Sequence, residues 1–138
     1  MLTKDDLKTL SEARIEDAVV LFQANKYSSA YYLAGYSIEL AIKVCISDLF
    51  QEGVIPDKGL VNATYTHDIE KLMNTAGISP DLKAHLKEDS QFSAYWGIVC
   101  QWSEQSRYKI TDSVTAAHLI TSIKDPDHGV LEWVKQHW

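Results

Sequence analysis

One stretch of the chain, Tyr27–Ile46, is apolar on nearly every side when it is drawn as a helix. It makes about five helical turns and contains only two charges, Glu39 and Lys43, one turn apart. A helix with so wide an apolar arc is normally surrounded by other helices. The stretch is too short, and too interrupted by charge, to span a bilayer. It therefore predicts the central helix of a soluble bundle.

A narrow polar strip is the exception on this helix, and it carries Tyr32, Tyr36, Glu39, Lys43 and Ser47. Glu39 and Lys43 have the acid-then-base order at i, i+4 that favours an ion pair. A solvated pair contributes only about 0.3–0.5 kcal/mol, whereas charges on a buried helix need partners. Two interpretations stay open: an ordinary exposed pair, or a strip that lines a pocket or a dimer cleft.

The overall composition predicts one soluble domain, 1–138. The chain has 138 residues, 46% of them hydrophobic and only three of them proline, which is enough for a real core. Its net charge of −6 argues against non-specific binding to nucleic-acid backbones, but it leaves room for a local basic pocket. The charged N-terminus does not resemble a signal peptide, so we expect a cytoplasmic, non-membrane protein in which Cys45 and Cys100 are free thiols.

Helical periodicity continues on both sides of the central stretch. Thr3, followed by two acids, predicts a helix to about Gln23 that forms a hairpin with the central helix, itself capped by Ser28 or Ser29. Residues 52–65 contain two glycines and a proline, and predict the longest loop. No long stretch alternates in the manner of a strand. The predicted fold class is all-α.

The second half of the chain predicts five more helices, each with its own start signal. The first is capped by Thr66 and ends at Gly77. The second is capped by Ser79, has Pro80 as its first residue and ends near Lys87. The other three begin at about Gln91, after a cap at Thr111 or Asp112, and at Asp125–Pro126. The helix from Gln91 is expected to continue to Tyr108 and carries an aromatic stripe, typical of a core or a subunit interface; a base-stacking platform is the alternative.

Residues with binding or catalytic chemistry are few. Arg107 could hold a phosphate in a bidentate manner, or it could cap helix-end carbonyls or pair with Glu104. His67, after the Thr66 cap, is expected to order the loop. None of the five histidines has helical metal-site spacing, and the face formed by Asp81, His85 and Asp89 is expected to be exposed, so we predict no metal and no cofactor.

Four segments, in their order and spacing, carry a resemblance to a known family: AYYLAGYSIELAIKVCI (30–46), THDIEKLM (66–73), YWGIVCQWSEQSRY (95–108) and HGVLEWVKQHW (128–138). Together they resemble the HEPN superfamily, small all-helical domains that are often described as nucleotide-binding. The resemblance covers nearly the whole chain. It is best over the helix with Glu39 and Lys43 and over the His67–Asp68 turn.

The resemblance implies an antiparallel up-and-down bundle of about four or five main helices with short additional ones. It also implies a homodimer with a cleft along the interface, and in some systems a nucleotidyltransferase partner in toxin–antitoxin or phage defence. Many members are metal-independent ribonucleases with an Arg and, about four to six residues later, a His that moves the 2′-hydroxyl proton. Arg14 and Arg107, the only arginines of this chain, have no histidine at that distance.

The missing pair points to a non-catalytic member that binds RNA, a nucleotide or a partner protein. Its binding residues are expected to be Tyr32, Tyr36, Glu39, Lys43 and Arg107. One alternative is a divergent ribonuclease in which Arg107 and His118 meet in space. Another is a purely structural subunit that docks onto a partner protein through Trp96, Trp102, Trp133 and Trp138.

Overall fold

Every regular element of the chain is helical, so the all-α prediction is confirmed. The computed structural model describes residues 1–138 and contains no strand. None of its helices is both long and apolar enough to cross a membrane. The elements are α1 (Lys4–Gln23), α2 (Tyr27–Ser47), α3 (Lys58–Thr64), α4 (Ile69–Thr75), α5 (Ser79–Glu88), α6 (Ser90–Cys100), the 3₁₀ helix η1 (Glu104–Tyr108), α7 (Ser113–Lys124) and α8 (Val130–Lys135).

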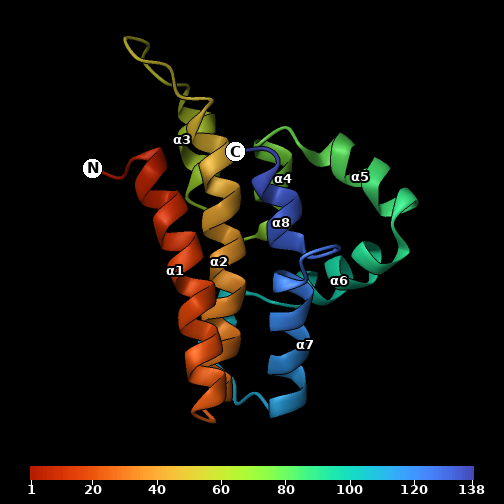
Figure 1. Cartoon of the computed structure of the whole chain (residues 1–138). Coiled ribbons are helices and arrows are strands. Elements are labelled where there is room, and N and C mark those ends of the chain that lie inside the picture. The colour runs from red at the N-terminus through yellow and green to blue at the C-terminus, as the bar shows by residue number, and fades with distance from the viewer.

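Helices α1 and α2 form the predicted antiparallel hairpin and lie side by side along their whole length (Figure 1). Thr3 caps α1 in a reciprocal arrangement: its hydroxyl accepts the Asp6 N–H at 3.1 Å, and the Asp6 carboxylate accepts the Thr3 N–H at 2.9 Å. Asn25, with φ 62°, makes the left-handed turn between the helices, a conformation that Asn tolerates better than most residues. Local capping chemistry thus sets where the hairpin begins and turns.

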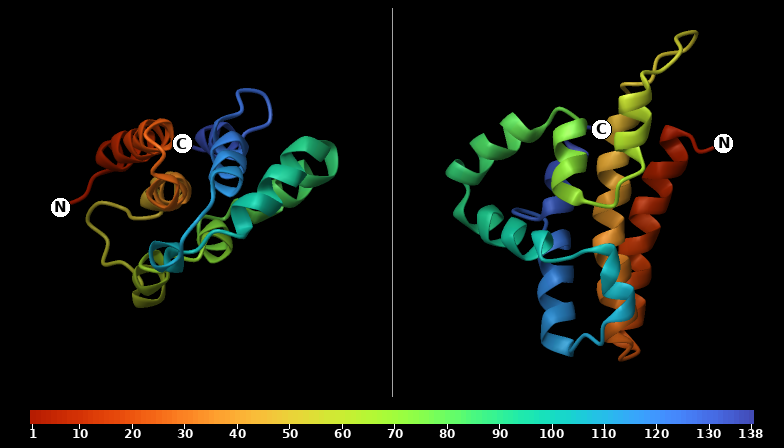
Figure 2. Two further views of the ribbon diagram at one scale, coloured as in Figure 1. Left: turned by 90° about the horizontal axis from the view of Figure 1, so that it is seen from below. Right: turned by 180° about the vertical axis from the view of Figure 1, so that it is seen from behind.

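Helix α2 is the centre of the bundle, as its apolar arc predicts. Thirteen of its 21 residues are buried, and it packs against α1, α4, α7, α8 and η1. The end-on view in Figure 2 places α2 between α1 on one side and α7 with α8 on the other. Helices α5 and α6 form an outer pair that contacts α7 and α8 (Figures 1 and 2). The longest apolar stretch is therefore the one that most other elements cover.

Three predicted caps are wrong, although the helices they belong to exist. Neither Ser28 nor Ser29 caps α2, which begins at Tyr27 without any side-chain cap. The cap of α4 is Asp68, whose carboxylate accepts the Lys71 N–H at 3.0 Å, while the Thr66 hydroxyl accepts the Asp68 N–H at 3.3 Å. Helix α5 begins one position earlier than predicted, so Ser79 lies inside it.

Some element boundaries also differ from the prediction. The predicted loop 52–65 contains α3, because the Asp57 carboxylate caps it by accepting the Leu60 N–H at 3.1 Å. The last helix begins at Val130, because the Asp125 carboxylate accepts two backbone N–H groups and closes a turn first. The Asp112 cap of α7 and the stop at Gly77, with φ 77°, are confirmed.

The aromatic helix is shorter than predicted and changes direction. Asp89 caps α6 by accepting the Phe92 N–H at 2.9 Å, and the helix ends at Cys100 rather than Tyr108. The chain then leaves the helix, and Trp102 turns into the bundle, where only 4% of its surface stays exposed. Burial of the large apolar indole favours this break in the helix. Trp102 is consequently placed against α2 instead of on the α6 stripe.

Candidate functional site

The polar strip of α2 lines two separate hollows and contacts a residue of a third, instead of lining one cleft. Tyr32 lines a hollow of about 400 Å³ near the start of α2. Lys43 and Ser47 line one of about 550 Å³ at its far end. Between them, Glu39 contacts His67, which lines a hollow of about 340 Å³. The strip residues follow one another along a single helix, but they face different surroundings.

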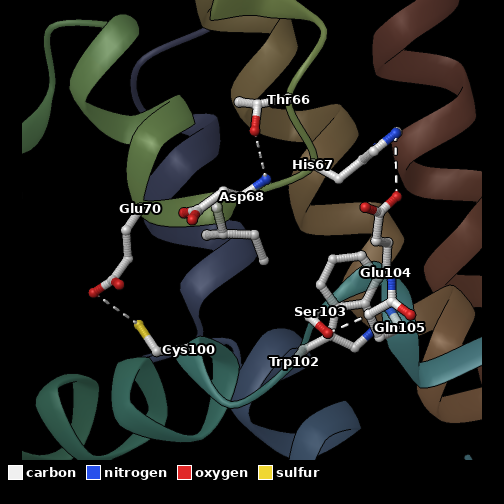
Figure 3. A pocket seen from close by; sticks show the side chains of 10 residues that line it. Thr66, His67, Asp68, Glu70, Cys100, Trp102, Ser103, Glu104 and Gln105 are labelled. Carbon is white, nitrogen blue, oxygen red and sulfur yellow. Dashed lines mark hydrogen bonds and ion pairs between the residues drawn. The ribbon is translucent and has the colours of Figure 1, made fainter.

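The Glu39 carboxylate is buried, with 1% of its side chain exposed. One oxygen lies 2.9 Å from His67 Nδ1 and the other accepts from Lys43 Nζ at 3.3 Å. On its other side, His67 Nε2 lies 3.3 Å from the Glu104 carboxylate (Figure 3). The interpretation of Glu39 and Lys43 as an ordinary exposed pair is therefore wrong. His67 ties the segment before α4 to both α2 and η1, and so orders it as predicted.

The hollow beside His67 is acidic. Its lining includes the carboxylates of Asp68, Glu70 and Glu104, with Trp102 beside them (Figure 3). The Cys100 thiol lies 3.7 Å from a Glu70 oxygen, and burial together with this carboxylate raises the pKa of Cys100 to about 12. No three His, Cys, Asp or Glu side chains are arranged to hold a metal ion. Clustered negative charge makes this hollow unfavourable for a phosphate.

Three aromatic rings stack along the first half of α2. The ring centres of Tyr36 and Tyr32 lie 6.1 Å apart with an angle of 10° between the ring planes. Those of Tyr32 and Trp102 lie 6.1 Å apart with an interplanar angle of 28°. The pKa of Tyr36 is raised mainly by burial and, to a smaller extent, by the nearby negative charge of Glu39. The Trp102 indole N–H is the single buried side-chain polar atom without a hydrogen-bond partner. Tyr32 therefore has two ring neighbours within the chain.

Two adjoining hollows lie at the start of α2, and we call them together the α2-start groove. The larger is lined by Tyr32, Ser106 and Arg107 among others. The smaller, of about 320 Å³, includes Lys26 in its lining and shares the Ser28 and Ser29 lining with the larger. The predicted site included neither Lys26 nor the two serines, because the sequence prediction assigned the serines as candidate caps of the helix, which the structure shows they are not. The fold thus brings two members of the predicted site, Tyr32 and Arg107, into one groove.

The α2-start groove carries two positive side chains that have no ion-pair partner in the chain. Neither Arg107 nor Lys26 takes part in an ion pair. The first turn of α2 contains no acid and receives no side-chain cap, so no side chain caps its N–H groups and no acid of that turn offsets the helix dipole. The Ser28 hydroxyl accepts the Thr111 N–H at 2.8 Å and keeps its own proton to donate. These groups are suited to an anion.

Arg107 pairs with neither of its predicted partners, Glu104 and His118. It makes no ion pair with Glu104, and its guanidinium lies 5.0 Å from the centre of the Tyr108 ring. His118 is exposed on α7, its side chain makes no hydrogen bond or ion pair, and it lines none of the main hollows. The structure shows no contact that would make Arg107 and His118 a pair.

Comparisons with protein-family models, with curated proteins and with solved structures find no match to this chain. Function is therefore inferred from the chemistry of the site itself.

Proposed function

We propose that this chain is a HEPN-like, non-catalytic module that binds a phosphate group of RNA or of a nucleotide in the α2-start groove. The resemblance of the four sequence segments supports the HEPN part of the proposal. One observation carries the binding part: Arg107 and Tyr32, far apart in sequence, line a single groove at the uncapped start of a 21-residue helix. A homodimer and a nucleotidyltransferase partner remain predictions of the resemblance.

Each group in the groove has a role that phosphate chemistry explains. The Arg107 guanidinium can donate two parallel hydrogen bonds to phosphate oxygens. The free first-turn N–H groups of α2 and the hydroxyls of Ser28 and Ser29 can donate to the remaining oxygens. Lys26 adds a second positive charge at the edge. Because Tyr32 already stacks with two rings, we expect recognition of the phosphate rather than stacking of a base.

The acidic hollow at His67 fits this function less well. The hollow at His67 is lined by three carboxylates and would repel a phosphate. It would accept a positively charged group, which makes a basic segment of a partner protein the second candidate ligand. The proposal contains no chemical step, because the arginine and the exposed His118 share no site.

The binding test compares two arginine variants in a titration with short single-stranded RNA and with a ribonucleotide. Arg107→Ala should weaken binding by about 10- to 100-fold, since it removes a charge-assisted hydrogen bond. Arg14→Ala is the matched control, because Arg14 pairs with Asp17 at 2.8 Å on α1. This variant should bind RNA as the natural chain does. Equal loss in both variants, or equal binding by all three chains, would contradict the proposal.

Salt dependence gives a second measurement on the same groove. With two cations neutralised on single-stranded RNA, the slope of log K against log salt should be about −1.4, falling to about −0.7 in Arg107→Ala. RNA kept with the protein in EDTA should stay intact. Cleavage that disappears in His118→Ala would establish the ribonuclease instead.

A further inference from the structure

The far end of α2 is followed by a long stretch that its own chain does not cover. No residue from Ser47 to Asp68 is buried, and residues 48–59 are all exposed. Residues 48–57, which we call the arm, project beyond the bundle before the chain returns as α3 (Figures 1 and 2). Helix α3 has only seven residues, and helices shorter than about 12 residues are marginal in water without packing. Within the chain α3 packs against α4, whereas the arm stays exposed.

Large apolar side chains gather at the same end of the molecule. Eleven large hydrophobic residues are exposed in the chain, and seven of them belong to this end: Met1, Leu2, Leu49, Phe50, Val54, Ile55 and Tyr65. Ile55, on the arm, is 94% exposed. Monomeric proteins rarely leave contiguous apolar patches beyond a few hundred Å².

An apolar groove lies at the base of the arm. Its volume is about 550 Å³, and six of its nine lining residues are hydrophobic, among them Leu7, Phe50, Val61 and Tyr65. The N-terminus, the end of α2 and the segment around α3 all contribute to its lining. An apolar projection and an apolar groove thus occur together on one face.

We propose that this face pairs with the same face of a second copy of the chain, with each arm lying in the groove of the other copy. A two-fold axis matches one surface with itself, so a face that carries both an arm and a groove can satisfy both at once. The proposal deepens the homodimer part of the proposed function by naming its surface. It does not depend on the α2-start groove, which lies at the opposite end of α2.

Area and charge both fit a second copy as the occupant. If a large apolar side chain has about 170 Å² of surface, the seven exposed side chains present roughly 800 Å² per copy, one partner's share of a standard interface. Glu52 and Lys58 flank the apolar tip and make no ion pair within the chain. Two-fold pairing brings unpaired charges of both signs to the rim, where they can neutralise each other.

The test measures the oligomeric state of the full chain by sedimentation, with two matched variants. Ile55→Asp places a charge on the arm and should weaken the dimer at least thirtyfold, which is the size of a hot-spot loss. Ile110→Asp makes the same change at a fully exposed isoleucine outside this face, and should leave the dimer intact. Neither position is packed, so both variants should fold, which circular dichroism checks.

The contact itself is tested by mixing a chain carrying Ile55→Cys with one carrying Tyr65→Cys. Oxidation should join unlike chains, because the arm of one copy lies in the groove of the other. A natural chain that stays monomeric up to roughly 100 µM overturns the proposal. So does a dimer that Ile55→Asp and Ile110→Asp affect equally. Loss of RNA binding in Arg107→Ala without a change in the dimer would leave this inference standing.

Discussion

The indole ring of Trp102 occupies the space in which a side chain at residue 35 would begin. A Cβ added to Gly35 would overlap three indole carbons of Trp102. Gly35 on α2 therefore allows the chain after α6 to turn inward. It also leaves room for the Trp102 ring that stacks on Tyr32.

Gly35→Ala should destabilise the fold by about 1–3 kcal/mol, because the indole must move and the core is overpacked. Urea unfolding measures the free energy of unfolding, and indole fluorescence should report a more exposed ring. Gly97→Ala is the control, since nothing lies within 4 Å of its added Cβ inside α6. That change should be neutral or should stabilise the chain by up to about 1 kcal/mol. Equal effects at both positions would contradict the packing described for Trp102.

Glu39→Gln should destabilise the chain by about 1–3 kcal/mol. It leaves the largely buried Lys43 ammonium without its counter-charge, and the loss falls below that of a fully enclosed pair because His67 is half exposed. Glu104→Gln changes the more exposed carboxylate on the other side of the same histidine and should cost less than about 1 kcal/mol. Denaturant unfolding of both variants tests this, and a larger loss for Glu104→Gln would refute the ranking.

The contact between α6 and the turn before α8 should make stability depend on pH. The hydrogen bond between His128 and Asp89, 2.7 Å long, raises the pKa of the imidazole and lowers that of the carboxyl. His85, 3.7 Å from the same carboxylate, also faces the contact. The raised His128 pKa stabilises the fold fully below its ordinary value of 6.5, and this contribution is lost as pH rises through the folded value. The lowered Asp89 pKa stabilises above 3.8, and that contribution is lost as pH falls.

The natural chain should therefore exceed His128→Ala in stability most clearly between pH 3.8 and 6.5, with a gap that narrows above and below that window. Urea midpoints at a series of pH values measure the gap. His118→Ala, which removes an exposed histidine without side-chain partners, should give no such profile. A gap that widens toward alkaline pH would show that the sign is wrong.

Both thiols should react slowly in the folded chain. Burial raises the pKa of Cys45 to about 11, and burial together with Glu70 raises that of Cys100 to about 12. At pH 8 the thiolate fraction is then roughly a thousandth or less. A disulfide reagent should label neither cysteine quickly before urea is added and both rapidly afterwards. Rapid labelling of one thiol in the folded chain would contradict the environment described for it.

The helical class, the α1–α2 hairpin and the caps at Thr3 and Asp112 could be predicted because they depend on periodicity and on hydrogen bonds within four residues. The same local rules failed where a competing bond lay close by. Asp68 caps α4 in place of the predicted Thr66. Asp125 closes a turn, so that the last helix begins only at Val130.

Long-range packing decided the site. The wide apolar arc of α2 marked Glu39 and Lys43 as unusual, but the partner that the Glu39 carboxylate contacts from another segment is His67, 28 residues further on. The meeting of Tyr32 with Arg107 likewise follows from the end of α6 at Cys100 and the inward turn of Trp102 over Gly35. Local patterns specify which side chains need partners. Only the burial of large apolar groups, summed over the whole chain, selects which distant residues provide them.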